Sequence, residues 1–112
     1  MLAKAIVRHL RMTPRKVGFV IAPLRQRTVA EAQAILASAN RRAAGPVSKA
    51  IASAFANARV KDPVLREDEV VITKIVADEG TTWKRFKAAA FGRAAPLLKR
   101  TTHLTVELDK TA

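Results

Sequence analysis

Side chains able to act as nucleophiles, general bases or metal ligands are few in this 112-residue sequence. Cysteine is absent, which excludes thiol catalysis, disulfides and cysteine zinc sites. The two histidines, His9 and His103, fall in different predicted strands. Each is expected to be a hydrogen-bonded structural residue or an RNA contact, and a ligand or catalyst least of all. The acidic run Glu67–Glu69 lacks the spacing of a calcium loop and has no histidine nearby. We therefore expect no enzyme, no metal site and no cofactor.

Lysine and arginine are the side chains whose number and placement do indicate a chemical role. They number 21 against 9 acids, which gives a net charge of +12 and a pI near 11.4. Residues 1–60 carry 11 bases and one acid, residues 62–79 six acids and two bases, and residues 80–106 six bases and no acid. A surface that only confers solubility mixes both signs. The pattern predicts two contact surfaces for a polyanion such as a nucleic acid, with a merely solvated face as the alternative.

The length and composition suit one compact domain spanning residues 1–112. Hydrophobic residues make up 49% of the chain, enough to build a core. The longest apolar run, Val17–Leu24, has eight residues, whereas a membrane-spanning helix needs about 20. The N-terminal segment lacks the uninterrupted apolar region of an export signal. We expect a soluble cytoplasmic protein that does not contact a membrane.

Three helices are predicted from start signals and apolar spacing. Thr13-Pro14 is a helix start, followed by an apolar stripe that Pro23 ends. Thr28–Glu31 matches a capping box, in which the threonine and the glutamate satisfy each other's backbone amides, and Asn40–Arg42 closes this second helix. Gly45-Pro46 opens a third helix. Its buried stripe comprises Val47, Ala50, Ile51, Ala54, Phe55 and Ala58.

Three strands are predicted, over Leu2–Arg11, Glu69–Asp78 and Thr101–Leu108, from alternation and β-branched content. The last two flank residues 79–100, a segment too long for an ordinary loop in so small a domain. If the strands continue into it, they form one antiparallel hairpin with its turn near Ala88–Gly92. A helix over Thr82–Ala95 is the alternative, because its three consecutive alanines favour helix.

Such a hairpin must project from the body as an arm. Each side would have about 11 residues and run roughly 35–40 Å, whereas a domain of this size has a radius of gyration near 13 Å. A lone two-stranded ribbon is marginal in water, so something anionic must hold its six bases from outside. Trp83 and Phe91 lie among these bases, where they either stack on nucleic-acid bases or pack across the ribbon.

Five stretches resemble, in order and spacing, the bacterial family of large-subunit ribosomal protein number twenty-two. They are LRMTPRKV, ITKIVADEG, WKRF, GRA and LKRTTHLTV, and they extend over essentially the whole chain. The resemblance implies an α+β fold, with three helices packed on a small three-stranded antiparallel sheet and a long protruding β-hairpin at about residues 79–101. This chain departs from the family's pattern at two places. It has Ala88–Ala90 where relatives commonly carry a proline and an extra base, and Gln26 where glycine is frequent.

The family's function implies partners and sites for this chain. The implied partners are 23S rRNA, neighbouring large-subunit proteins, the nascent peptide and macrolide antibiotics near the hairpin tip. The tip, facing the peptide-exit tunnel, comprises Lys87, Ala88, Ala89, Ala90, Phe91 and Gly92. The candidate rRNA-binding residues are Arg8, Arg11, Arg15, Lys16, Arg25, Arg27, Trp83, Lys84, Arg85, Lys87, Arg93, Lys99, Arg100 and His103. The alternative function is a free-standing basic architectural protein that coats DNA or RNA.

Overall fold

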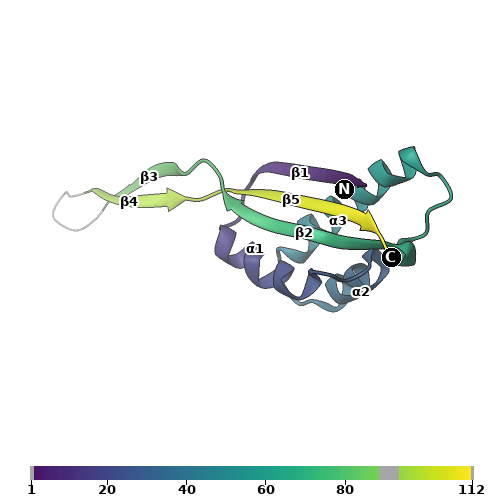
Figure 1. Cartoon of the computed structure of the whole chain (residues 1–112). Helices are drawn as coiled ribbons and strands as arrows, with labels where there is room; N and C mark the ends of the chain where they lie inside the picture. Colours follow the sequence, from purple (N-terminus) through teal and green to yellow (C-terminus); the bar gives the residue numbers. More distant parts are fainter. Residues whose placement is uncertain (1, 89–93, 112) are drawn as a thin grey trace.

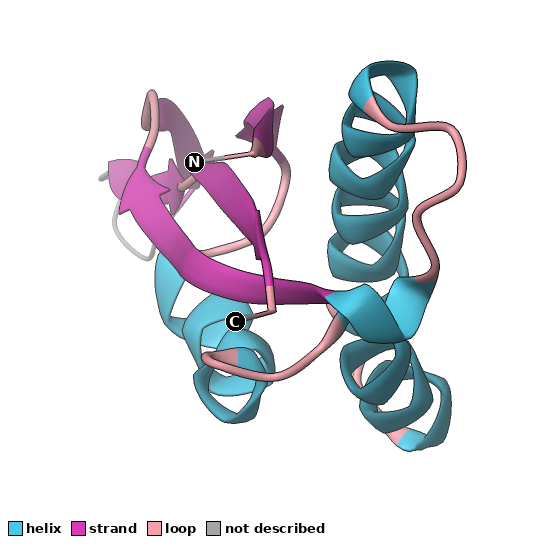
Figure 2. Ribbon diagram, turned by 45° about the vertical axis from the view of Figure 1, so that its right-hand side comes forward, coloured by secondary structure: helices cyan, strands magenta, loops and turns pink. Residues whose placement is uncertain are grey.

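Three strands form a sheet with three helices on one face, and a two-stranded arm extends from one end of that sheet (Figure 1). This computed structural model describes residues 2–88 and 94–111, and between Trp83 and Leu98 it describes the backbone alone. Figure 2 shows the sheet and the helices as separate layers. The α+β class and the layered arrangement implied by the resemblance are confirmed.

The sheet has the order β1-β5-β2 and is antiparallel throughout, with β1 spanning Ala3–Leu10, β5 Thr102–Lys110 and β2 Val70–Glu79. The central strand β5 therefore pairs with both neighbours, and Val106 lies opposite Ala5 on one side and Ile75 on the other. Alternation gives β5 one fully buried face. Its members are Thr102, Leu104, Val106 and Leu108, which alternate along the strand predicted over Thr101–Leu108.

Helix α1 spans Pro14–Ile21 and begins where the sequence places a cap. The Thr13 hydroxyl accepts a hydrogen bond from the backbone N–H of Lys16 at 3.4 Å, and proline occupies the first helical position. A 3-10 turn over Ala22–Leu24 follows and contains Pro23, which cannot continue an α-helix. The predicted start, stripe and end of this helix are confirmed.

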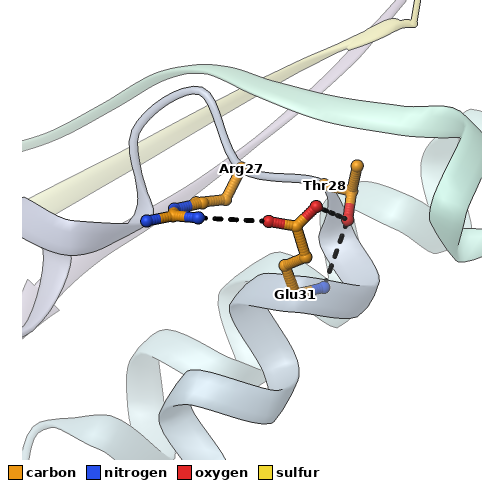
Figure 3. Close-up of polar contacts among 3 residues, drawn as sticks. All are labelled: Arg27, Thr28 and Glu31. Atoms are coloured by element: carbon orange, nitrogen blue, oxygen red, sulfur yellow. Dashed lines mark hydrogen bonds and ion pairs between the residues drawn. The ribbon is translucent and has the colours of Figure 1, made fainter.

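Helix α2 spans Val29–Ser38 and has Thr28 as its N-cap. The Thr28 hydroxyl accepts from the backbone N–H of Glu31 at 3.2 Å, as a capping box requires. The Glu31 carboxylate, however, accepts from the Thr28 hydroxyl at 3.3 Å and from the Arg27 guanidinium at 3.4 Å (Figure 3). In a complete capping box the Glu31 carboxylate would accept from the backbone amide of Thr28, as the sequence predicts. Here it accepts from the Thr28 hydroxyl and the Arg27 guanidinium, because Arg27 precedes the cap and attracts the carboxylate.

Helix α3 spans Ala44–Lys61 and supplies most of the helical core. Its predicted stripe is confirmed, since all six side chains are buried. Four of the six are alanine or valine, which lets the helix lie close to β1 and β5 on the inner face of the sheet. In the loop after α3, Leu65 is 5% exposed and joins the core.

The turn between α1 and α2 requires a left-handed backbone conformation. Gln26 has a φ of 64°, in the region where a side chain is strained and glycine is not. Its backbone N–H donates to the carbonyl of Ile72 at 2.9 Å, and the N–H of Ile72 donates to the carbonyl of Arg27 at 2.9 Å. These two bonds attach the turn to β2 and explain why the conformation is kept.

The arm is an antiparallel ribbon of β3 (Trp83–Ala88) and β4 (Ala94–Lys99), with Trp83 opposite Lys99 and Ala88 opposite Ala94. The hairpin prediction is confirmed, and the helix over Thr82–Ala95 is wrong for the described residues. The molecule measures 64 × 25 × 17 Å with a radius of gyration of 17.0 Å, well above the roughly 13 Å of a compact domain. Residues 89–93, which include most of the predicted turn, lie outside the described residues.

The arm joins the body through a short interruption, where the sequence predicts continuous strands. The ribbon β3-β4 is a sheet separate from β1-β5-β2. Across the interruption, the Gly80 N–H donates to the Thr101 carbonyl at 2.9 Å, and the Thr101 hydroxyl donates to the Thr81 carbonyl at 2.6 Å. A side-chain hydrogen bond thus replaces part of the backbone ladder between the two sheets.

Candidate nucleic-acid interface

A groove of about 900 Å³ opens where the arm meets the body. Four segments distant in sequence form it: the residues after β1, the start of α1, the connection between α2 and α3, and the end of β4. Of the described residues that line it, six are basic and none is acidic. The bases are Arg11, Lys16, Arg41, Arg42, Lys99 and Arg100.

Hydrogen bonds to the backbone hold the loop between β1 and α1, which forms one side of the groove. The hydroxyl of Thr102, on the central strand, is fully buried and donates to the Met12 carbonyl at 2.6 Å. The Met12 N–H donates to the Leu10 carbonyl at 2.8 Å, and Thr13 then caps α1. The two bases beside this loop, Arg11 and Lys16, are therefore carried on a segment tied to β5, which continues from the arm.

The electrostatics of the groove favour an anionic ligand. Six like charges around one concavity raise the local positive potential, and low-dielectric walls focus it. A smaller hollow of about 420 Å³ adjoins, lined by Arg15 and Arg100 together with Glu79. Glu79 pairs with Arg100 at 3.5 Å, but both side chains are about half exposed, so the ion pair is weak and leaves Arg100 able to exchange partners. Such a surface offers the positive charge and the hydrogen-bond donors that a phosphate-binding site needs.

The structure brings together some of the predicted rRNA-binding residues. Arg11, Lys16, Lys99 and Arg100 all line the groove, and Arg15 lies in the adjoining hollow. The other predicted residues of the body lie elsewhere. Arg8 is exposed on β1, Arg25 is exposed after the 3-10 turn, and Arg27 pairs with Glu31.

The arm residues are placed by backbone only. Trp83, Lys84, Arg85 and Lys87 lie on β3, as does the predicted tip residue Ala88. The remaining tip residues (89–92) and Arg93 lie outside the described residues.

His103 contacts another residue of the chain, His9. Its Nδ1 accepts a hydrogen bond from the His9 backbone N–H at 3.2 Å, and the two rings meet edge to face with centroids 5.0 Å apart. His9 has a φ of 57° and lies where β1 shifts register against β5. Of the two roles predicted for His103, the structure displays the structural hydrogen bond.

Sequence reasoning missed two residues of the groove, Arg41 and Arg42. It assigned them only to the end of the second helix, whereas α2 ends at Ser38 and both arginines line the groove from the connection to α3. The available signal was a tandem pair of arginines in a segment with a single acid. What the sequence does not display is that this connection lies beside the end of β4.

Neither a metal-ligand cluster nor a membrane-spanning helix is found in the part of the chain that the structure describes. Within residues 2–88 and 94–111, no three histidine or acidic side chains gather as metal ligands would. Over the same residues, no helix combines the length and apolarity needed to cross a bilayer.

The fold and groove define a small basic α+β protein that presents clustered cations at the root of a long ribbon. Residues 5–109 match the family model described as ribosomal protein L22p/L17e. The large ribosomal subunit protein uL22 of Bifidobacterium longum (strain DJO10A) is 49% identical over 109 residues, covering 93% of this chain and 91% of the relative. The protein of the same name from Bifidobacterium animalis subsp. lactis (strain AD011) is 48% identical over the same span.

The chain therefore belongs to the uL22 family, ribosomal protein L22p/L17e. Members of this family are structural, non-enzymatic components of the ribosome, which agrees with the expectation of no enzyme. The resemblance drawn from the sequence alone is confirmed.

Proposed function

We propose that the protein is a structural constituent of the large subunit of the cytoplasmic ribosome, where it binds 23S rRNA. The observation that carries this proposal is the acid-free groove with its six bases at the root of the arm. Phosphate contacts supply most of the affinity of such proteins, and each base placed against a phosphate releases bound counterions. Within the groove, Arg11, Lys16, Lys99 and Arg100 hold rRNA near the body.

The arm supports a second part of the proposal, that the chain bridges several rRNA domains. Body and arm are both basic, and the molecule is 64 Å long, so one chain reaches segments of RNA that are far apart. A ribbon of two strands has little stability alone, and rRNA around Lys84, Arg85 and Arg93 holds it. The tip, Lys87–Gly92, then lines the nascent-peptide exit tunnel, near bound macrolides. Neighbouring large-subunit proteins contact the remaining surface.

A salt series tests the rRNA contact. The full chain is titrated with 23S rRNA and with a DNA duplex of equal length, and the logarithm of the binding constant is plotted against that of salt. We expect a preference for rRNA of several orders of magnitude. Arg100→Ala should weaken binding and reduce the slope by about one. Lys49→Ala, an exposed base on α3 outside the groove, is the matched control and should leave the slope nearly unchanged.

The alternative, a free-standing architectural protein, makes the opposite prediction for the same titration. Ribosomal assembly requires discrimination between nucleic acids, whereas generic polyanion binding does not. If rRNA and duplex DNA bind equally and weaken together as salt rises, the ribosomal proposal is wrong. Bridging is tested separately. One rRNA fragment is immobilised and a second is labelled, and bridging requires that the labelled fragment is retained when the full chain is added.

A further inference from the structure

Phe19 is a large apolar side chain that the core does not use. Helix α1 buries Val17, Val20 and Ile21, whereas Phe19 lies on another face of the helix and is 55% exposed. A single exposed apolar residue is ordinary, but an aromatic ring surrounded by cations offers a specific contact surface.

Two guanidinium groups flank this ring. The Cζ of Arg15, one turn earlier on α1, lies 5.8 Å from the ring centroid, and the Cζ of Arg41, from the connection between α2 and α3, lies 5.7 Å from it. Arg41 also lines the basic groove, and Arg15 lines the smaller hollow beside it. The ring is therefore at the margin of the surface proposed to hold phosphates. The acid lining these hollows is Glu79, which pairs with Arg100.

We infer that Phe19 and Arg41 form a stacking site for one unpaired RNA base whose flanking phosphates lie in the groove. Aromatic rings and guanidinium planes are the surfaces on which proteins stack exposed bases. A base within a duplex already stacks on its neighbours, so the site selects a single-stranded or bulged nucleotide. This inference rests on the proposed rRNA binding and specifies the state of the RNA that the groove accepts. Phe and Arg are also enriched in protein interfaces, but the adjoining groove with its six bases and no acid favours RNA over a protein partner.

The test uses two ten-nucleotide RNAs of one mixed, non-self-complementary sequence, the second with three central abasic positions. Both carry the same phosphates, and only the first offers bases at the centre. Phe19→Leu keeps an apolar side chain and removes the π face. We expect it to weaken binding of the intact RNA between about five-fold and 150-fold, the range of one base–aromatic stack, without altering the salt slope. Binding of the abasic RNA should change little.

Arg42→Ala provides the matched control, because Arg42 lines the groove and touches no aromatic ring in the described structure. It should weaken both RNAs alike and lower the salt slope by about one. The stacking inference is overturned if Phe19→Leu binds the intact RNA as tightly as the unmodified chain does, or if it weakens the binding of both RNAs equally. In either case, weaker binding by Arg42→Ala would still support the proposed rRNA binding. If neither substitution affects binding, the proposed function itself fails. Unchanged RNA binding with impaired incorporation into reconstituted subunits would assign Phe19 to a protein contact instead.

Discussion

Gly80, at the joint between body and arm, lets the side chains of Thr101 and His103 lie closer to its backbone than a Cβ atom would allow. A Cβ added at this residue would lie 2.6 Å from the Thr101 hydroxyl oxygen and 3.1 Å from the His103 Cε1. Thr101 is 4% exposed and its hydroxyl is committed to the Thr81 carbonyl at 2.6 Å. Because a threonine side chain is stiff at χ1, it cannot yield without breaking that hydrogen bond.

Gly80→Ala should therefore lower the free energy of unfolding by about 1–2 kcal/mol. Leaving a buried hydroxyl without its partner costs about 1–3 kcal/mol. Alanine has less conformational entropy than glycine in the unfolded chain, and this stabilises the folded variant by about 0.4–1 kcal/mol, which offsets part of that cost. Urea unfolding with linear extrapolation measures the difference directly, and the expected fall in Tm is about 5 °C per kcal/mol.

Gly18→Ala is the matched control for this change. A Cβ at Gly18, in the middle of α1, meets no neighbouring atom within 4 Å, so the substitution should stabilise by about 0.5–1 kcal/mol through helix propensity. In a Thr101→Ala background, Gly80→Ala should lose most of its penalty, since the obstructing oxygen is gone. The reasoning is refuted if Gly80→Ala stabilises as much as Gly18→Ala, or if its cost is the same with and without the Thr101 hydroxyl.

Three further substitutions test the body by urea unfolding. Gln26→Gly should stabilise by about 0.5–1 kcal/mol because glycine is unstrained at φ 64°, whereas Arg25→Gly, at φ −64°, should destabilise; equal effects would contradict the strain argument. Ala54→Leu should destabilise by about 1–3 kcal/mol by overpacking a fully buried position, and Ala52→Leu on the exposed side of α3 should be nearly neutral. Thr28→Ala should cost about 1 kcal/mol by removing the α2 cap, with Thr28→Ser retaining it; no difference between the two would exclude the capping role.

The helices and strands of the body were predictable because their signals are local. A cap at Thr13, an apolar stripe on α3 and strict alternation over β5 each depend on residues within one element. The arm was harder, because Ala88–Ala90 favours helix locally while the flanking strands favour a ribbon. Strand pairing is a tertiary contact, and for β3 and β4 it prevails over propensity.

The groove could be predicted only in part. A count of charges identifies a basic chain, and the family resemblance selects Arg11, Lys16, Lys99 and Arg100, but neither displays Arg41 beside them. That proximity depends on contacts between residues far apart in sequence, such as the 90-residue separation of Met12 and Thr102. The joint at Gly80 escaped prediction for the same reason, since local strand signals on either side of it do not show that the hydrogen-bond ladder divides into two sheets there.

The order of the strands has a consequence for synthesis. The central strand β5 is the last of the five in chain order, while β1 and β2, its partners, are not adjacent to each other. As the chain is made, both outer strands emerge without a neighbour to pair with, and the helices lack the face on which they pack. The sheet, the core and the basic groove thus form together in a late step, after the arm has been synthesised. Until then, the bases that line the groove lie on separate segments and form no single surface.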